Sequence, residues 1–364
     1  MAPMSLQQLA SALPGRLSGA DTVFSSVCTD SRTLQPGDLY VALRGERFDG
    51  HDFVAQAFAA GACGALVERE VGTAGSTLEV TDTLVALGAI AARNRESFSG
   101  RLIAITGSSG KTTTKNLLAG IVGLAGPALA TRGNLNNEIG VPLTLLQLAP
   151  EHEYAVIEMG AGKPGDIRYL CSLARPDVSI LLNVMPAHLE GYGSVDRVAE
   201  TKAEILAGLD DHGIAVYDLS SRYAPLFAEA TGAATLVGFD SQGSGGVHAG
   251  SVTLDKAGRA RFELCTDNGS VPVQLQLCGE HNVANALAAA AAALAVGVDL
   301  ETVARGLADV QAEPGRMQVN ELRQGTLLID DSYNANPGSV RAAIEFLAAL
   351  SGRRGLVLGA MAEL

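Results

Sequence analysis

The sequence contains no tryptophan, and aromatic residues make up only 4% of its 364 residues. Proteins that bind single-stranded nucleic acid stack bases on aromatic side chains, so this composition counts against that class. Basic residues are also few: 26 Lys and Arg stand against 39 Asp and Glu, which gives a formal net charge of −13. A general binder of nucleic acid or of an anionic membrane needs a broad basic surface. We therefore expect no nucleic-acid partner, and any recognition of phosphate must be local.

The sequence also lacks paired cysteines and long apolar runs. Its five cysteines are widely spaced and form no C-x-x-C pair, which predicts reduced thiols rather than disulfides or a structural metal site. No apolar run reaches the roughly 18 residues of a transmembrane helix, and the first residues lack the basic start of a secretory signal. We expect a cytoplasmic protein with no membrane insertion.

Glycine is abundant, with 42 residues, and the length predicts two or three domains. From residue 83 onwards helices alternate with apolar strands, a pattern typical of a doubly wound α/β domain with a parallel sheet. Alternating residues at 247–277 predict an antiparallel insertion. The predicted domains are 1–81, 82–313 and 314–364. The third contains only two predicted strands, 327–331 and 355–359, so we expect the chain to be a truncated form of a longer protein.

The stretch that indicates function most clearly is T-G-S-S-G-K-T-T at 106–113, between an apolar run and a predicted helix. Its two glycines permit backbone conformations closed to other residues, so that N–H groups of the turn and helix converge on an anion. Lys111 adds a positive charge, and Thr112 adds a hydroxyl suited to Mg²⁺. Ile105 stands where the first glycine of a complete Walker A motif belongs. The flanking strand and helix favour a nucleotide-phosphate site over a simple glycine turn.

Other polar residues follow predicted strands. Glu158 ends the strand 154–158, where either a Mg²⁺ ligand or a strand cap is expected. His188 follows the next strand, although a lone histidine is more often structural than metal-binding. Lys202 lies in a predicted helix next to acidic residues, and the pattern alone predicts an exposed helix lysine.

Four further segments are rich in polar groups. The run D-D-S-Y-N-A-N-P at 330–337 follows a strand and favours a ligand site over a turn. A similar cluster occupies 131–138, and the amides at 279–285 either contact a base or cap a helix. The loop 44–52 holds two arginines, and by itself a solvated loop is favoured over a diphosphate clamp.

Together these motifs resemble the Mur ligase family, the ATP-dependent amide-bond enzymes of cell-wall precursor synthesis. The shortened phosphate loop is typical of that family. Three further stretches carry the resemblance, namely D-S-R at 30–32 with 45–53, then 133–142, and then 330–337. The resemblance covers essentially the whole chain. It implies a three-domain Mur ligase architecture, with a small α/β N-terminal domain, a central P-loop ATPase domain and the start of a Rossmann-like C-terminal domain.

The member of the family that this sequence resembles most adds D-alanyl-D-alanine to UDP-N-acetylmuramoyl-tripeptide through an acyl phosphate. The resemblance therefore implies a bacterial, cytoplasmic and monomeric ligase that uses ATP and Mg²⁺. Three alternatives stay open: a tripeptide-forming Mur ligase, a folylpolyglutamate synthase, and a nucleotide-binding module or fragment that does not ligate. Folate enzymes lack the UDP-binding first domain, and the tripeptide-forming enzyme is expected to differ in its third-domain motif.

The resemblance also implies roles for individual residues. The implied catalytic residues are Lys111, Glu158, His188 and Lys202. The implied ATP-binding residues are Gly107, Ser108, Ser109, Gly110, Lys111, Thr112, Thr113, Asn282, Arg316 and Asp331, with His281 and Asn285 beside them. The implied substrate-binding residues are Ser31, Arg32, Arg47, Phe48, Asp49, His51, Asn134, Asn136 and Asn137. The implied metal ligands are Thr112, Glu158, His188 and Lys202, the last carbamoylated by CO₂. The carbamate reverses the interpretation of Lys202 as an ordinary exposed lysine.

Overall fold

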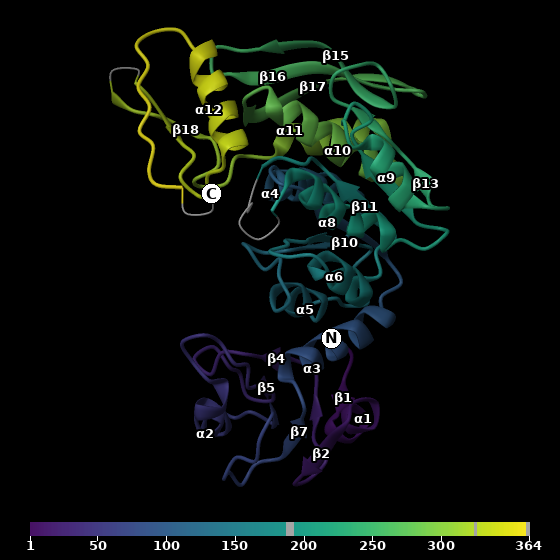
Figure 1. The fold of residues 1–364 in the computed structure, drawn as a ribbon, viewed down its shortest axis with the longest axis vertical. Helices are drawn as coiled ribbons and strands as arrows, with labels where there is room; N and C mark the ends of the chain where they lie inside the picture. The colour runs from purple at the N-terminus through teal and green to yellow at the C-terminus, as the bar shows by residue number, and fades with distance from the viewer. Residues whose placement is uncertain (187–192, 324–325, 362–364) are drawn as a thin grey trace. The chain divides into compact units, whose positions relative to one another are not determined.

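A computed structural model describes residues 1–186, 193–323 and 326–361 of the protein. The chain divides into two compact units (Figure 1). Unit 1 comprises Met1–Ser99 and Arg132–Glu151, and unit 2 comprises Gly100–Thr131 and His152–Leu364. The segment 132–151 therefore belongs to unit 1, although unit 2 flanks it on both sides in the sequence. The domain boundaries predicted at 81 and 313 stay predictions.

Unit 2 is built on a six-stranded parallel sheet in the order β13-β12-β11-β8-β10-β9. The strands are β8 (Arg101–Thr106), β9 (Ala128–Ala130), β10 (Tyr154–Glu158), β11 (Val178–Leu181), β12 (Ile214–Tyr217) and β13 (Thr235–Leu236). The apolar runs of the sequence at 102–106, 154–158, 178–182 and 214–217 predict four strands, and the four central strands confirm them to within one residue. The edge strands β9 and β13 were missed because runs of 3 and 2 residues are too short to show a pattern.

Helices cover both faces of this sheet, as in a doubly wound fold. They are α4 (Lys111–Ala125), α6 (Asp166–Ala174), α8 (Val195–Ala207), α9 (Ala224–Thr231), α10 (His281–Ala295) and α11 (Leu300–Asp309). α4 packs on β8, β9 and β10 and also contacts α10 and α11, whereas α6 and α8 pack on each other and on β8. One continuous core joins the sheet to α4 and α10 through residues such as Ile103, Ile121 and Leu287.

A second sheet of unit 2 confirms the predicted antiparallel insertion, with α10 packed against it. Its strands, in order, are β14 (Phe239–Asp240), β15 (Val247–Leu254), β16 (Arg259–Thr266) and β17 (Gly269–Cys278). β15, β16 and β17 pair antiparallel, and the short β14 joins β15 in parallel.

The last segment of unit 2 contains β18 (Gln318–Glu321), β19 (Leu327–Asp330) and α12 (Pro337–Ala349). β18 and β19 form an antiparallel pair. The strand predicted at 355–359 was wrong, because these residues have no strand structure and Val357 is fully exposed. The apolar run predicted a buried strand, but a strand needs a paired neighbour, and β19 pairs only with β18 among the described residues.

Unit 1 contains a five-stranded sheet in the order β2-β7-β6-β5-β4 and a small β1-β3 pair. The strands are β1 (Met4–Ser5), β2 (Gly15–Ser18), β3 (Val23–Phe24), β4 (Val27–Cys28), β5 (Leu39–Val41), β6 (Gly64–Val67) and β7 (Thr77–Val80). The helices are α1 (Leu6–Ala12), the 3₁₀ turn η1 (Gly50–Phe53), α2 (Val54–Ala59), α3 (Thr83–Glu96) and α5 (Gly140–Leu145). The sequence at 22–28 predicts a single strand, but the structure splits it, because β3 pairs with β1 while β4 pairs with β5.

Within the described residues, no helix combines the length and the apolar character needed to cross a membrane.

The contact between α4 and α11 depends on a glycine. A Cβ atom on Gly306 would lie 2.5 Å from the Ile121 Cα and 2.8 Å from the Ile121 N, both backbone atoms that cannot move aside. We predict that Gly306→Ala lowers the free energy of unfolding of unit 2 by about 1–3 kcal/mol, because the two helices must separate. Thermal unfolding followed by circular dichroism measures the change.

Gly123 on α4 is the matched control, since a Cβ there meets no atom within 4 Å. Gly123→Ala is expected to stabilise by about 0.5–1 kcal/mol through helix propensity. Equal midpoints for the two variants would contradict the close approach of α4 and α11.

Candidate active site

The phosphate loop lies between the C-terminal end of β8 and the first turn of α4. Gly110 caps the helix with a left-handed backbone, φ 81° and ψ −4°. A side chain there would be strained, and its Cβ would come within 2.3 Å of the Asn285 Oδ1. The Lys111 Nζ donates a hydrogen bond to the Gly107 carbonyl at 2.8 Å, so the ammonium lies against the loop. The turn therefore has the backbone shape and the charge that suit a bound phosphate.

Asn183, two residues after β11, holds this loop in place. Its side-chain Oδ1 accepts from the Ser109 N–H at 3.0 Å, and its Nδ2 donates to the Ser109 carbonyl at 3.1 Å. Its own carbonyl accepts from the Ser108 N–H at 3.1 Å, and the Ser108 hydroxyl accepts from the Met185 N–H at 2.9 Å. Asn183 was not among the predicted site residues, although a polar residue just after an apolar strand is the signal that also drew attention to His188.

Glu158 reaches the same edge of the sheet from the neighbouring strand. β10 pairs with β8 in parallel so that Glu158 lies opposite Ile105, next to the loop. The Glu158 N–H donates to the Thr131 Oγ1 at 2.9 Å. Glu158 is 2% exposed, and Thr112 in the first turn of α4 is similarly buried. A carboxylate and a hydroxyl beside a phosphate loop are oxygen donors of the kind that Mg²⁺ prefers, so these residues fit that ion.

Lys202 on α8 is buried, with 6% of its surface exposed. The prediction of an exposed helix lysine, made from the pattern alone, was therefore wrong. Its acidic neighbour Glu204 is buried too. The Glu204 carboxylate is satisfied there, because it accepts hydrogen bonds from the N–H groups of Gly165 and Arg168 at 2.9 and 3.0 Å, where α6 begins. Burial, and then repulsion by Lys111, lowers the pKa of Lys202 to about 7. Much of this amine is therefore uncharged near neutral pH.

His188 lies outside the described residues. Within residues 1–186, 193–323 and 326–361, no group of three or more His, Cys, Asp or Glu side chains is arranged to hold a metal ion. Mg²⁺ in nucleotide enzymes is commonly bound by one or two carboxylates together with the phosphates themselves. Glu158 supplies one carboxylate and Thr112 one hydroxyl, so Mg²⁺ could bind here together with the phosphates without a cluster of three protein ligands.

The first turn of α10 lies beside the loop. The Asn285 Oδ1 points at Gly110, and its Nδ2 donates to the Asn282 Oδ1 at 2.9 Å. The Asn282 Nδ2 donates to the Cys278 carbonyl at 2.8 Å, and both asparagines are buried. The structure thus brings the predicted nucleotide residue Asn282 close to the phosphate loop through Asn285.

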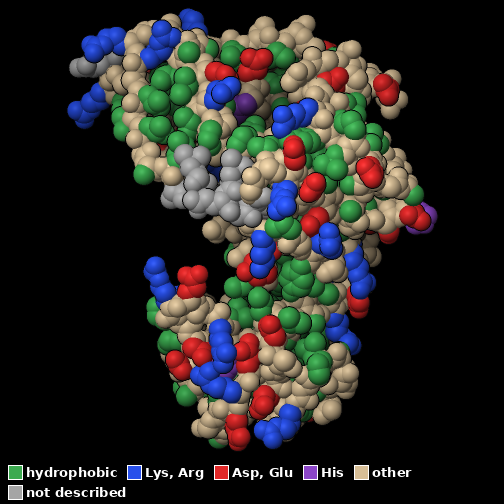
Figure 2. Space-filling model, in the orientation of Figure 1, with side chains coloured by type: hydrophobic (Ala, Val, Ile, Leu, Met, Phe, Trp, Pro, Cys, Tyr) green, Lys and Arg blue, Asp and Glu red, His purple; other side chains and the backbone are tan. Residues whose placement is uncertain are grey.

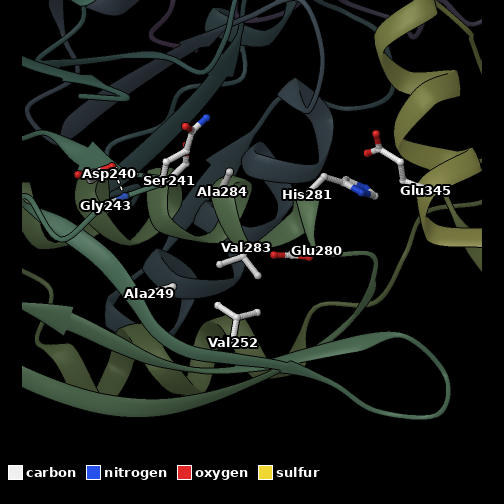
Figure 3. Close-up of a pocket in the computed structure, with 11 residues that line it drawn as sticks. Asp240, Ser241, Gly243, Ala249, Val252, Glu280, His281, Val283, Ala284 and Glu345 are labelled. Carbon is white, nitrogen blue, oxygen red and sulfur yellow. Dashed lines mark hydrogen bonds between the residues drawn. The ribbon is translucent and has the colours of Figure 1, made fainter. Parts of the chain in front are cut away.

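A pocket of about 400 Å³ lies next to this turn, between α10, the loop after β14 and α12 (Figure 3). Figure 3 shows the His281 ring pointing towards α12, which carries Glu345. Glu280 and Asp240 also line the pocket, but the Asp240 carboxylate accepts hydrogen bonds from its own loop. His281 therefore faces a polar pocket at the N-terminal end of α10.

Arg316 and Asp331 come together near α4. The Asp331 Oδ1 accepts from the Met317 N–H at 3.0 Å, and burial raises the pKa of Asp331. The Arg316 Cζ lies 3.9 Å from the centre of the Tyr333 ring. Burial lowers the pKa of Lys115 on α4, and the nearby Arg316 charge adds to that lowering. Arg316 thus lies near the helix that begins at the phosphate loop, and Asp331 lies near Arg316.

In unit 1, loops follow the carboxyl ends of the adjacent parallel strands β4, β5 and β6, and so meet at one edge of the sheet. The predicted substrate residues on the first two loops are Ser31, Arg32, Arg47, Phe48, Asp49 and His51. Arg47 and Phe48 are exposed. Arg32 forms a forked ion pair with Asp30, Nε–Oδ1 2.8 Å and Nη2–Oδ2 2.6 Å, which lowers the pKa of Asp30 to about 2.

Asp49 organises this edge. Its Oδ1 accepts from the His51 backbone N–H at 3.0 Å and meets the His51 Nδ1 at 2.6 Å, while its Oδ2 accepts from the Arg69 Nη1 at 2.8 Å. These hydrogen bonds lower the pKa of Asp49. The His51 Nε2 accepts from the Glu68 N–H at 2.8 Å, so both ring nitrogens of this buried histidine are occupied. His51 therefore fixes Asp49 instead of facing solvent.

Arg69 was missed by sequence analysis because no motif marks it. Figure 2 shows basic and acidic side chains next to one another on unit 1. Arg44 belongs to the same network, with its Nε 3.4 Å from Glu68 and 3.7 Å from Asp49. This edge of unit 1 is therefore a mixed network of charges.

The three predicted asparagines of unit 1 precede α5. The Asn137 Oδ1 accepts from the Gly140 N–H at 2.9 Å, where the helix begins, and the Asn136 N–H donates to the Asn134 carbonyl at 2.7 Å. Asn134 and Asn137 are exposed.

Comparison with known proteins matches three consecutive parts of this chain. Residues 23–106 match the Mur ligase family catalytic domain, 105–293 the Mur ligase middle domain, and 315–364 the Mur ligase glutamate ligase domain. The UDP-N-acetylmuramoyl-tripeptide–D-alanyl-D-alanine ligase of Escherichia coli (strain K12) is 45% identical over 380 residues, covering 100% of this chain and 80% of its own. The chain belongs to the Mur ligase family.

Solved structures place this Mur ligase with the MurF enzymes. MurF from Acinetobacter baumannii is 42% identical with a TM-score of 0.92, covering 97% of this chain and 78% of its own. MurF from Thermotoga maritima in complex with ADP is 33% identical with a TM-score of 0.81, covering 90% and 75%. The predicted Mur ligase fold is confirmed.

The burial of Lys202 should make the stability of this Mur ligase depend on pH. The unfolded lysine keeps its proton up to its ordinary pKa of 10.5, whereas the folded one loses it near 7. Between these pH values the unfolded state binds more protons than the folded state. The free energy of unfolding therefore rises as the pH is raised and decreases as the pH is lowered. We predict that Lys202→Met flattens this rise, which reaches about 1.4 kcal/mol per pH unit.

Urea unfolding between pH 7 and 9 tests this, in buffer freed of CO₂, which reacts with neutral amines. Lys163→Met is the control, because Lys163 is exposed. If Lys202→Met keeps the pH dependence of the wild type, Lys202 is not the group responsible.

Proposed function

We propose that this Mur ligase joins D-alanyl-D-alanine to UDP-N-acetylmuramoyl-tripeptide, with ATP as the source of energy, in the synthesis of peptidoglycan precursors. The observation that carries the proposal is the similarity to a ligase named for this reaction, at 45% identity over 100% of this chain and 80% of the relative's own length. The phosphate loop with Lys111, Thr112 and Glu158 around it supports the use of ATP, as does the ADP bound in the Thermotoga maritima enzyme.

The nucleotide would occupy the edge where β8, β10 and β11 end. The backbone of Gly107, Ser108, Ser109 and Gly110 would surround the phosphates, with Lys111 and Thr113 completing the turn. Asn282 would contact the base, and Arg316 and Asp331 would contact phosphate and ribose. The proximity of Asn285 to Gly110 and of Arg316 to Lys115 supports this assignment.

Mg²⁺ would rest on Thr112 and Glu158, with His188 and Lys202 serving a second ion. When bound, Mg²⁺ offsets the negative charge that builds on the transferring phosphoryl group. The protein's own contribution is to bury both oxygen donors beside the loop and to hold Lys111 against it.

Lys202 would act as a carbamate. A neutral amine adds to CO₂ with formation of an N–C bond and loss of one proton, and a pKa of about 7 leaves enough neutral amine for this step. The product is an anion, so repulsion between Lys202 and Lys111 becomes attraction. Burial then protects the carbamate from exchange with solvent.

The substrate would bind unit 1 through the edge that carries Ser31, Arg32, Arg47, Phe48 and Asp49. We propose that His51 acts through Asp49 and that Asn134, Asn136 and Asn137 contact the sugar and peptide. Arginines suit the diphosphate of a UDP group because their forked donors match phosphate oxygens.

The reaction would proceed in two steps. The terminal carboxylate oxygen of the peptide attacks the γ-phosphorus of ATP, an acyl phosphate forms, and ADP leaves. The amine of D-alanyl-D-alanine then attacks the acyl carbon, an amide bond forms, and phosphate leaves as the amine gives up its proton. Lys111 would stabilise the charge that develops in the first step.

We further propose that the protein acts as a monomer in the bacterial cytoplasm. All five cysteines are free thiols, as expected in a reducing compartment.

Phosphate release from ATP tests the reaction. We predict turnover only when UDP-N-acetylmuramoyl-tripeptide and D-alanyl-D-alanine are both present, because the acyl phosphate needs the first and its release as amide needs the second. Each substrate is omitted in turn, and the amide product is measured by mass spectrometry.

Other outcomes separate the alternatives. Turnover unaffected by either omission indicates a nucleotide-binding module without ligase activity. Turnover with UDP-N-acetylmuramoyl-dipeptide and a single amino acid indicates a tripeptide-forming ligase.

Removing the Lys202 amine tests the carbamate. We predict that Lys202→Ala loses activity by about 100-fold or more, as expected for the loss of a group at a metal site. Formate or acetate should restore part of it by supplying carboxylate oxygens in the vacated space. Wild-type protein in ¹³C-labelled bicarbonate should give a carbamate NMR signal that is absent in the variant. Lys163→Ala is the control, and near-normal activity of Lys202→Ala would return this residue to a structural role.

A further inference from the structure

The segment Glu313-Pro-Gly-Arg316 is fastened to the helix of the phosphate loop. The Glu313 Oε1 accepts from the Asn116 Nδ2 at 2.7 Å, and the Glu313 Oε2 lies 3.8 Å from the Arg316 Nε. Asn116 stands five residues after the first residue of α4, less than two turns from the loop. One carboxylate therefore joins the phosphate-loop helix to the arginine.

A second contact holds the other part of Arg316. Its guanidinium lies over the Tyr333 ring, with Cζ 3.9 Å from the ring centre. The backbone of Tyr333 is held in turn, because its N–H donates to the Gly315 carbonyl at 3.0 Å. Gly315 has a φ of 73°, and a Cβ there would come 3.2 Å from the Tyr333 N, so this approach needs glycine. Stacking on an aromatic face and pairing with a carboxylate together restrict a long, flexible side chain.

The charges around this contact alternate in sign. Lys115, next to Asn116 on α4, is 3% exposed and feels the attraction of both Glu158 and Glu313. Glu158 ends β10, and Glu313 pairs with Arg316. The series Glu158, Lys115, Glu313 and Arg316 thus runs from the strand end beside the loop to the last segment of the chain. Each charge has an opposite neighbour, which stabilises the arrangement.

We propose that Glu313 is a positioning residue for nucleotide binding, and that Asn116, Glu313 and Tyr333 hold the Arg316 guanidinium ready for a phosphate of ATP. This inference rests on the proposed function in taking ATP as the nucleotide. The advantage is preorganisation: a side chain already restrained loses less freedom when the ligand arrives. Glu313 itself touches no nucleotide in this proposal and acts through Arg316.

The affinity for Mg²⁺-ATP, measured by isothermal titration calorimetry, tests this in the full chain. Glu313→Gln keeps the side-chain shape and an acceptor for Asn116 but removes the charge that Arg316 pairs with. We expect about three- to tenfold weaker binding, the value of immobilising one flexible side chain. Asn116→Ala and Tyr333→Leu should weaken binding by similar factors, and Tyr333→Phe, which keeps the ring, should restore what Tyr333→Leu loses.

A double-mutant cycle separates this role from a merely structural one. If Glu313 acts through Arg316, Glu313→Gln should weaken binding in the wild type but have no further effect in an Arg316→Met background. Glu313→Gln also removes an attraction on the buried Lys115, so its thermal midpoint should fall by a few degrees, and this fall, unlike the loss of affinity, should persist in the Arg316→Met background. Glu321→Gln on β18 is the matched control, because this glutamate is exposed.

Several outcomes overturn the proposal. The first is an affinity for Mg²⁺-ATP in Glu313→Gln equal to that of the wild type. The second is a loss of affinity on Glu313→Gln that is as large in the Arg316→Met background as in the wild type. The third is tighter binding by Glu313→Gln, which would mean that Glu313 competes with phosphate for the arginine. A wild-type protein that binds Mg²⁺-ATP but forms no amide contradicts the proposed function and leaves this inference standing. If the wild type forms the amide and Glu313→Gln binds Mg²⁺-ATP as tightly as the wild type, this inference alone is contradicted.

Discussion

Burial of the Lys202 amine near the Lys111 ammonium governs the chemistry at the edge where β8, β10 and β11 end. Lys111 lies against the loop carbonyl of Gly107, and Lys202 is buried nearby on α8. Burial removes the water that would stabilise a charged Lys202, and Lys111 repels that charge, so the lowered pKa leaves much of the amine neutral near neutral pH. The Lys111 ammonium at this edge therefore favours an anion beside it, whether a phosphate or a carbamate. A protein with a net charge of −13 thus keeps a local site of the opposite sign.

The organisation of unit 2 was predictable because its signals are local. Continuous apolar runs predicted β8, β10, β11 and β12, since strands buried on both faces need no alternation. The turn at 106–113 was predicted from its residue types together with the strand and helix on either side, and the structure has that strand and helix as β8 and α4. Those predictions concern neighbours in the sequence, where the same residues that set the backbone also set the chemistry.

What escaped prediction depends on contacts between distant segments. The burial of Lys202 follows from the packing of α8. The acidic residues next to Lys202 in the sequence had indicated an exposed face of the helix instead. Asn183 holds Ser109 across 74 residues of sequence, and Glu313 meets Asn116 across 197. The apolar run at 355–359 formed no strand, because a strand depends on a partner that its own residues do not encode. The role of His51 as a buried partner of Asp49 likewise emerges only once β6 brings Glu68 to its ring.

The division of the chain has a consequence for its covalent layout. The polypeptide passes between the units three times, after residues 99, 131 and 151. Unit 1 is therefore not a continuous stretch of sequence, and no single truncation of the gene would yield it intact. A protease that cuts one of these passages leaves the two units joined by the other two. Any rearrangement between the units must be accommodated at three backbone crossings at once, which limits the motions open to the chain to those that all three permit.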